Sequence, residues 1–289
     1  MMLQMLKDLF GGRKAAAARA ESAAEIYQAA IAAWQAGDAA LALDYCKRLR
    51  RDAPAFQETD MLQAQLRFPG EHYFQILARI IETTRPRSYV EIGVAQGDSL
   101  RLVRAPTIAI GIDPAPQITA PLLPNQKVFA ETSDGFFAGH DLRAELGGLP
   151  VDLAFIDGMH HFEFALRDFF NMERYCTPAS TILIHDVYPL DRETAERDRK
   201  RSFWSGDIWR LILALKKYRP DLTVQTIATA PTGLALVRKL DPGSRVLSER
   251  HDQICQEYLA LDYSHIEDDM AGKLNLFPND WERIRALLG

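Results

Sequence analysis

The feature that most constrains the fold is a series of seven short apolar segments between residues 88 and 239, separated by stretches of helical composition. Most of these segments are continuous apolar runs, which are typical of strands buried on both faces of a parallel sheet. Alternation of such strands with helices predicts an α/β domain with helices on both faces of the sheet. The predicted strands are 88–93, 107–113, 127–131, 151–157, 180–186, 222–228 and 233–239.

The connection between the last two predicted strands is too short for a parallel crossover. Only "TAPT", residues 229–232, joins them, whereas a crossover needs about a dozen residues or more. These two strands must therefore form an antiparallel hairpin. The sequence predicts a Rossmann-like α/β sheet of seven strands, six of them parallel and the last antiparallel, preceded by a helix over residues 71–85.

The chain upstream of this sheet has a different texture. Residues 14–67 are rich in good helix formers, with apolar residues at three- and four-residue spacing, a break at Gly37-Asp38 and a stop at Pro54. The pattern resembles one unit of a tetratricopeptide repeat, and a solenoid needs about three units. We expect residues 1–67 to be a helical appendage that packs on the main domain or on a partner. The main domain is predicted over 71–245, and a helical tail over 246–289.

Composition restricts the classes of function. The net charge of −5 argues against a broad nucleic-acid surface, and no apolar run approaches the roughly 18–20 residues of a membrane span. The three cysteines are far apart and lack CxxC spacing, which indicates reduced thiols. The sequence therefore predicts a cytoplasmic protein that has no membrane span and does not bind nucleic acid.

Glycines and acids mark the turn after the first predicted strand. The pattern is Glu91-x-Gly93-x-x-x-Gly97, whereas a dinucleotide fingerprint G-x-G-x-x-G would need glycines where Ala95 and Asp98 stand. Asp113 ends the second strand, where a carboxylate can accept the hydrogens of a ribose diol. The alternative is that the glycines serve only a tight turn between strand and helix, which we expect to begin near Asp98.

This pattern resembles the first motif of the class I S-adenosylmethionine-dependent methyltransferases, whose seven-stranded sheet ends in the same antiparallel hairpin. The resemblance implies S-adenosylmethionine as cofactor, with Asp113 holding the ribose and Gly93 allowing the methionine part to approach. It also places Ser133 and Asp134 near the adenine, although Asp134 could instead cap the following helix. The predicted cofactor-binding residues are Glu91, Gly93, Gly97, Asp113, Ser133 and Asp134.

A second group of polar residues follows the fourth and fifth predicted strands. Asp157 and Asp186 end neighbouring strands, about 4.8 Å apart, so their carboxylates should lie side by side. Two such carboxylates repel one another unless a proton or a cation binds between them. Mg²⁺ is commonly bound by one or two carboxylates, and His185 is a further candidate ligand.

The motifs "DGMH" at 157–160 and "HD" at 185–186 resemble the branch of class I methyltransferases related to catechol, sugar and antibiotic O-methyltransferases. The resemblance implies a divalent cation, Mg²⁺ or Mn²⁺, at Asp157 and Asp186, with His185 as a third candidate ligand where a sugar-modifying relative has an acid. Val187 stands where the catechol group has an amide ligand, and it cannot coordinate a metal. His160 or His161 could remove the acceptor proton, with Asp157 as the third catalytic candidate. The alternative is structural: an Asp-Gly turn and two histidines at a helix start.

The segment between the fifth strand and the hairpin is predicted to be a charged loop over the carboxyl edge of the sheet, where lids are often found. Its basic residues could attract an anionic acceptor or form a solvated face. These residues are Arg192, Arg197, Arg199, Lys200 and Arg201.

Together these patterns predict an S-adenosylmethionine-dependent methyltransferase that methylates a hydroxyl of a sugar or another small molecule. The first alternative is a nucleotide-binding oxidoreductase, which the missing glycines disfavour. The second is a non-catalytic scaffold that uses residues 1–67 to bind a protein partner or a second copy of the chain.

Overall fold

The computed structural model describes residues 21–289, which fall into two compact units, one ending at Thr59 and one running from Asp60 to Gly289. The part of the predicted appendage in residues 1–20 lies outside the described residues. Within 21–289, no helix is long and apolar enough to cross a membrane. The cytoplasmic location stays a prediction.

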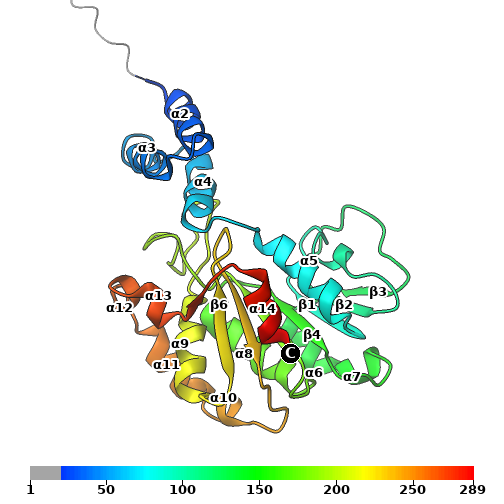
Figure 1. Cartoon of the computed structure of the whole chain (residues 1–289). Helices are drawn as coiled ribbons and strands as arrows, with labels where there is room; N and C mark the ends of the chain where they lie inside the picture. The colour runs from blue at the N-terminus through cyan, green and yellow to red at the C-terminus, as the bar shows by residue number, and fades with distance from the viewer. Residues whose placement is uncertain (1–20) are drawn as a thin grey trace, which may run out of the picture. The chain divides into compact units, whose positions relative to one another are not determined.

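The first unit is a helix pair, α2 (Ala23–Gln35) and α3 (Ala39–Asp52) (Figure 1). Asp38 caps α3 by accepting a hydrogen bond from the Leu41 amide at 2.9 Å. Gly37 has a φ of +84°, which glycine adopts without a Cβ penalty. The predicted break at Gly37-Asp38 is thus confirmed, and α3 ends before Pro54 as expected. α4 (Glu58–Arg67) follows.

The second unit is built on one sheet with the strand order β3-β2-β1-β4-β5-β7-β6-β8. All neighbours pair in parallel except β7, which is antiparallel to both β5 and β6. The predicted sheet with its single antiparallel hairpin strand is confirmed. The strands are β1 Ser88–Ile92, β2 Ile108–Ile112, β3 Gln126–Phe129, β4 Leu153–Ile156, β5 Thr181–His185, β6 Thr223–Ile227, β7 Leu234–Arg238 and β8 Leu276–Phe277.

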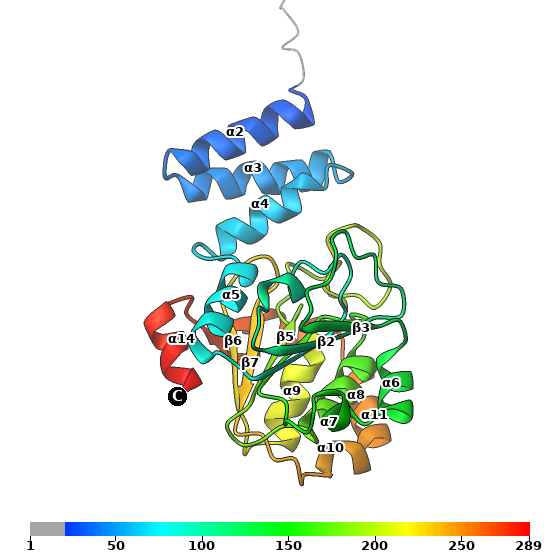
Figure 2. The same cartoon turned by 90° about the vertical axis from the view of Figure 1, so that its right-hand side faces the viewer.

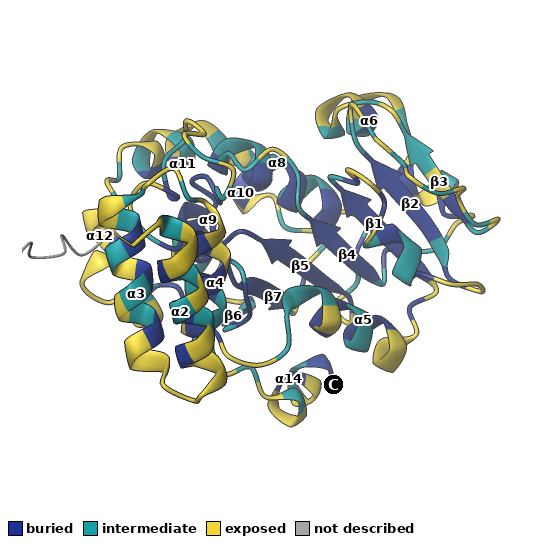
Figure 3. Cartoon of the chain, turned by 90° about the horizontal axis from the view of Figure 1, so that it is seen from above, coloured by how far each residue is buried: buried dark blue, intermediate teal, exposed yellow. Residues whose placement is uncertain are grey.

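Helices cover both faces of this sheet (Figures 2 and 3). α5 (Tyr73–Thr84) and α14 (Trp281–Leu288) bury Ile76, Ile80 and Ile284 against one face. The other face carries α6 (Ser133–Gly139), α8 (Phe162–Glu173), α9 (Trp209–Tyr218) and α11 (His251–Leu259). The short elements are η1 Leu100–Leu102, α7 Leu142–Glu145, α10 Val246–Glu249, α12 Ser264–Glu267 and α13 Met270–Lys273.

Two sequence predictions about elements are wrong. The helix expected to begin near Asp98 is a single 3₁₀ turn, η1, because residues 95–98 form a turn. The tail is not wholly helical, because β8 adds an eighth strand by pairing in parallel with β6. A two-residue strand carries no periodicity that the sequence could reveal.

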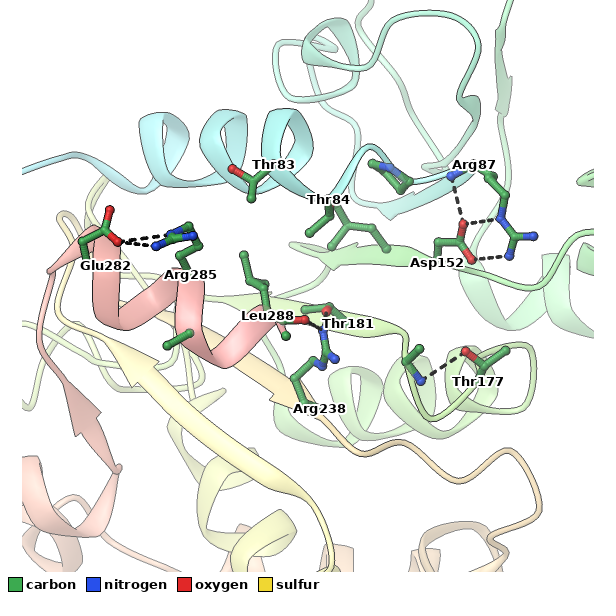
Figure 4. Close-up of a pocket in the computed structure, with 15 residues that line it drawn as sticks. Thr83, Thr84, Arg87, Asp152, Thr177, Thr181, Arg238, Glu282, Arg285 and Leu288 are labelled. Atoms are coloured by element: carbon green, nitrogen blue, oxygen red, sulfur yellow. Dashed lines mark hydrogen bonds and ion pairs between the residues drawn. The ribbon is translucent and has the colours of Figure 1, made fainter.

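A pocket of about 610 Å³ lies at the amino edge of the sheet, away from the edge where ligands bind in doubly wound folds (Figure 4). Arg87 is paired there with Asp152, and Arg285 with Glu282. Arg238 donates to Thr181 Oγ1 and to the Leu288 carbonyl, near the end of α14. A cation at a helix C-terminus satisfies free carbonyls and opposes the helix dipole. Arg238 therefore satisfies the end of α14, and the other two arginines are paired with acids. The candidate site lies at the opposite edge.

Candidate functional site

Gly93 directly follows β1, has a φ of +87° and lies directly against the residue that follows β4. A Cβ at this position would lie 1.9 Å from the Asp157 carbonyl oxygen and 2.9 Å from Gly158 Cα. The Asp157 amide in turn donates to the Ile92 carbonyl at 2.8 Å. Glycine is required here by the packing of two strand ends, whatever else the turn holds.

Asp113, at the end of β2, binds this turn through its side chain. Its Oδ2 accepts the amides of Val94 and Ala95, each at 2.9 Å, and its Oδ1 accepts the Ala115 amide at 2.8 Å. A carboxylate has about four acceptor positions, so roughly one remains for a ribose hydroxyl. Asp113 thus shapes the turn between β1 and η1 and retains capacity for a single further donor.

Glu91 is fully buried and faces into the protein. It accepts hydrogen bonds from Tyr89 Oη at 2.6 Å and from Ser99 Oγ at 2.7 Å. Burial raises the pKa of Glu91 to about 8, and the two hydrogen bonds oppose that rise only in part. Gly97 has a φ of +80°, and a Cβ there would lie 3.1 Å from Ile118 Cδ1. Glu91, through its hydrogen bond from Ser99, and Gly97, through its close packing on Ile118, therefore stabilise the turn from inside the protein.

Ser133 and Asp134 begin α6 after β3. The proposed cap function of Asp134 is wrong: Thr132 is the N-cap, and its side chain accepts the Gly135 amide at 3.1 Å. Asp134 instead forms a two-pronged ion pair with Arg167 of α8, with contacts of 2.8 and 2.9 Å. Burial raises the pKa of Asp168 to about 7, against a hydrogen bond from Ser133 that lowers it.

Four side chains from the ends of β4 and β5 meet at the carboxyl edge: Asp157, His160, His185 and Asp186. His160 Nε2 lies 3.1 Å from Asp186 Oδ2 and 3.7 Å from Asp157 Oδ1. His185 Nδ1 lies 3.2 Å from Asp186 Oδ2 and 3.3 Å from Asp157 Oδ1. The predicted meeting of the two carboxylates is thus found, with one histidine nitrogen on each side of them.

Asp186 is 5% exposed and has a φ of +60°. Its Oδ1 accepts a 2.6 Å hydrogen bond from Thr232 Oγ1 of the β6–β7 hairpin. Burial would raise the pKa of Asp186, but His160 and His185 outweigh it and hold the pKa well below its usual range. Burial likewise disfavours charge on His185, yet Asp186 and Asp157 raise its pKa to about 10. The Asp186 carboxylate is therefore stabilised as an anion by the two histidines.

The tautomer of His160 follows from its second ring nitrogen. Nδ1 lies 3.1 Å from the Trp204 carbonyl oxygen, which can only accept, so Nδ1 carries a proton. In the neutral ring, Nε2 then presents a lone pair to Asp186 Oδ2. A lone pair and a carboxylate at 3.1 Å repel one another unless a positive charge lies close to both, supplied by a proton on Nε2, a metal ion or a neighbouring imidazolium.

A divalent cation fits this donor set. Asp157, His160 and Asp186 each offer one ligand atom, and these atoms lie within 4.8 Å of one another. An ion bound at about 2.1 Å would place adjacent ligand atoms about 3 Å apart, close to the 3.1 Å separation of the His160 and Asp186 atoms. The three-residue group contains His160, which the sequence suggested as a base, in place of His185.

His161 points away from the carboxylates. Its Nε2 lies 3.1 Å from the Arg197 carbonyl oxygen. The ring centroid of Tyr73, from α5, lies 4.0 Å from the ring centroid of His185. Nothing in the sequence spacing of Tyr73 indicates this contact with the site.

The basic residues of the loop after β5 are engaged by acids or carbonyls. Arg192 pairs with Asp262 and Glu267, and Arg197 pairs with Glu163 and Asp207. The loop is therefore cross-linked to the rest of this unit. Both interpretations of these arginines stay predictions: the Arg192 side chain is 47% exposed within its ion pairs, whereas Arg197 pairs with the fully buried Asp207.

Residues 90–187 match the model of a family described as a methyltransferase domain. Solved structures similar to the chain include an O-methyltransferase from Bacillus cereus in complex with SAH, at 14% identity and a TM-score of 0.41, covering 66% of this chain and 94% of that one. The O-methyltransferase TomG from Streptomyces achromogenes, in complex with SAM, has 16% identity and a TM-score of 0.44, with 64% and 89% covered. Among curated proteins, no sequence matches the chain.

The matched segment spans β1 to the residue after Asp186, and so contains the glycine turn, Asp113 and both site carboxylates. On this match, residues 90–187 form a methyltransferase domain. The structural likenesses, at these TM-scores, add no conclusion about activity.

Proposed function

We propose that this enzyme transfers the sulfonium methyl group of S-adenosylmethionine to a hydroxyl oxygen of a small molecule. The proposed site is formed by Asp157, His160, His185 and Asp186. One observation carries the proposal: two carboxylates and two imidazoles converge at the carboxyl edge, beside the Gly93 turn. Acids and histidines clustered at adjacent strand ends are a common arrangement for proton removal.

The reaction is a direct displacement. The acceptor oxygen forms a bond to the methyl carbon as the carbon–sulfur bond breaks, and the sulfonium becomes a neutral thioether. The acceptor hydroxyl must also lose its proton. The protein then has three tasks, which are to align the two substrates, to exclude water and to favour loss of that proton.

A divalent cation would be held by Asp157, His160 and Asp186. When bound, such an ion lowers the pKa of a hydroxyl that it ligates. His185 would then neutralise charge behind the ligands, through its contacts with both carboxylates. In this arrangement His160 Nε2 is occupied, and the proton passes to solvent or to another group.

The second candidate is a metal-independent transferase, favoured by the position of His185. Its Nδ1 reaches both carboxylates, so an imidazolium can supply the positive charge that the pair needs. His160 Nε2 is then free to accept the acceptor's proton, with Asp186 beside it to stabilise the imidazolium. Both candidates use the same residues and differ in which cation sits between the carboxylates.

The acceptor class that we propose is a sugar hydroxyl, because the motifs at Asp157 and at His185-Asp186 resemble those of sugar-modifying relatives. A panel of sugars and catechols incubated with labelled S-adenosylmethionine tests this class. Methylation of catechols alone would replace the sugar by an aromatic acceptor.

Calorimetry separates the candidates before an acceptor is known. We expect S-adenosylhomocysteine to bind and NAD not to bind. Mn²⁺ should bind to the wild type and fail to bind to Asp186→Asn, while the variant keeps its affinity for S-adenosylhomocysteine. If the wild type does not bind Mn²⁺, the metal-independent candidate is selected. If NAD binds and S-adenosylhomocysteine does not, the proposal is overturned.

A further inference from the structure

The loop that carries His160 is fixed by a segment that lies far along the chain, just before α9. We propose that Trp204, Gly206 and Asp207, called here the brace, position the His160 imidazole between the site carboxylates. The proposal rests on the proposed function of that site. Asp207 and Gly206 are positioning residues in this account, because neither touches the carboxylates themselves.

Asp207 binds the backbone on both sides of His161. Its amide donates to the His160 carbonyl at 3.2 Å, and its Oδ1 accepts the Phe162 amide at 2.6 Å. Asp207 is fully buried. A single residue therefore sets the path of the chain from the site loop into the first turn of α8.

The carboxylate of Asp207 is itself held by two guanidinium groups. Its Oδ2 accepts from Arg197 at 2.8 Å and from Arg210. Arg197 also forms contacts of 2.7 and 2.9 Å with Glu163 in the first turn of α8. A buried carboxylate with charged partners on one oxygen and a backbone amide on the other has little freedom to move.

Gly206 makes the close approach possible. It has a φ of +65°, and a Cβ there would lie 1.9 Å from the His160 carbonyl oxygen and 2.9 Å from His160 Cβ. Backbone at such a distance cannot give way to a side chain without displacing the loop. The Gly206 amide is meanwhile bound to the Thr194 carbonyl at 3.1 Å. Glycine is thus required by the contact with His160.

Trp204 fixes the imidazole ring. Its indole stacks on His160 with centroids 5.1 Å apart and planes 17° from parallel, and its carbonyl accepts from Nδ1. The indole Nε1 donates to the Glu196 carbonyl at 2.6 Å, which holds the tryptophan itself. A partner on Nδ1 selects the tautomer in which Nε2 is available to a proton or a metal.

The brace also explains the backbone of His160. A φ of +30° is unfavourable for a residue with a side chain and persists only where the surroundings impose it. The hydrogen bonds to residues 160 and 162, with the Gly206 contact between them, supply that constraint. Without them, His160 should relax to the right-handed region and its ring should leave the carboxylates.

The test compares Gly206→Ala and Asp207→Ala with a matched control, Glu163→Gln. The control also loses an Arg197 ion pair at the same helix start, but it leaves the backbone of the site loop untouched. Long-range proton–nitrogen NMR of labelled histidines reports the His160 tautomer in the absence of metal, and His160→Ala assigns the signal. Calorimetry with Mn²⁺ and with S-adenosylhomocysteine completes the set.

We expect the wild type and Glu163→Gln to show the Nδ1-protonated tautomer, and the two brace variants to lose it. Their Mn²⁺ affinity should fall about 10–100-fold, as when an outer partner of a metal-bound histidine is removed, with S-adenosylhomocysteine affinity unchanged. Asp207→Asn, which keeps an acceptor for the Phe162 amide, should retain the tautomer. If Asp207→Ala fails to fold, Gly206→Ala, which leaves the ion pairs intact, decides.

An unchanged His160 signal in both folded brace variants would overturn the proposal, as would an equal loss in Glu163→Gln. If the wild type binds no Mn²⁺, the metal candidate fails, but the tautomer measurement still tests whether the brace positions His160. The two failures are therefore distinguishable.

Discussion

Ala95, His160 and Asp186 have positive φ angles of 45°, 30° and 60° and follow three neighbouring strands of the sheet, β1, β4 and β5. Non-glycine residues in this region carry a conformational cost and tend to gather at functional sites. The surroundings that hold them are visible here: Asp113 binds the Ala95 amide, the brace holds His160, and Thr232 binds Asp186.

Gly93→Ala should destabilise the protein strongly, because the new Cβ would meet the Asp157 carbonyl oxygen and because φ is +87°. Overpacking and a left-handed backbone together predict a loss of about 2–4 kcal/mol in the free energy of unfolding. Gly139→Ala, with no atom within 4 Å of its Cβ, is the control and should be neutral or slightly stabilising. Urea denaturation measures both. Equal effects would refute the packing argument.

Asp168→Asn should change how stability depends on pH. The pKa of Asp168 rises from 3.8 to about 7 on folding, because burial disfavours its charged form. The stabilisation that arises because folded Asp168 holds its proton more tightly is therefore fully present below about pH 4 and is lost as the pH rises toward 7. Asp168→Asn has no such loss. Its free energy of unfolding should therefore rise relative to that of the wild type by up to about 1.4 kcal/mol per pH unit across that range.

Denaturation series between pH 4 and 8 check this expectation. Ser133→Ala removes a hydrogen bond that lowers the pKa of Asp168, so in that variant the loss should extend to higher pH. Parallel pH profiles for the wild type and Asp168→Asn would contradict the assignment.

At the scale of elements, a buried ion pair joins the end of α8 to the segment after α9. Arg219 and Glu173 are 2% and 3% exposed, with an Nη1–Oε2 distance of 2.7 Å, and Glu173 Oε1 also accepts the Asp241 amide. Removing one partner of a buried pair leaves an uncompensated charge, so Glu173→Gln should cost about 3–5 kcal/mol.

Asp221→Asn is the matched control, since Asp221 contacts the same arginine but its side chain is 53% exposed. Its loss should cost less than about 1 kcal/mol. Thermal or chemical denaturation of the two variants distinguishes them. A cost for Glu173→Gln as small as that of Asp221→Asn would show that water reaches the pair.

The elements themselves were largely predictable, because strand runs and helix caps are local patterns. The break at Gly37-Asp38 and the short "TAPT" hairpin were correct for that reason. The helix expected near Asp98 is reduced to the 3₁₀ turn Leu100–Leu102, and the backbone ahead of it is held by Asp113, which binds the amides of Val94 and Ala95 from the end of β2. Such a contact depends on the fold and leaves no local signal.

At the scale of the whole molecule, the boundary between appendage and enzyme is open to test by truncation. α4 ends in Arg67, which donates to the carbonyls of Pro189 and Leu190 at 2.9 and 2.6 Å, and Phe68 packs edge-on against Tyr188 at 5.2 Å. Removing residues 1–57 should spare both contacts. Removing residues 1–69 should abolish them and lower the melting temperature.

Both truncated chains should be compared with the full chain for S-adenosylhomocysteine affinity and for association state. We expect unchanged cofactor affinity in the shorter deletion, because the glycine turn and Asp113 lie well downstream. Loss of cofactor binding in that deletion would show that the helix pair is needed by the enzyme. A change in association state alone would support the predicted role of residues 1–67 as a partner-binding appendage.

The sequence by itself determined the succession of the first seven strands along the chain, the antiparallel hairpin and the meeting of Asp157 with Asp186. These follow from local apolar runs and from the rule that parallel strands end at one edge. Only the tertiary structure decided which histidine faces the carboxylates. His160 and His161 are adjacent and chemically identical, and Gly206 and Asp207, distant in sequence, set the backbone that turns one inward and the other toward Arg197.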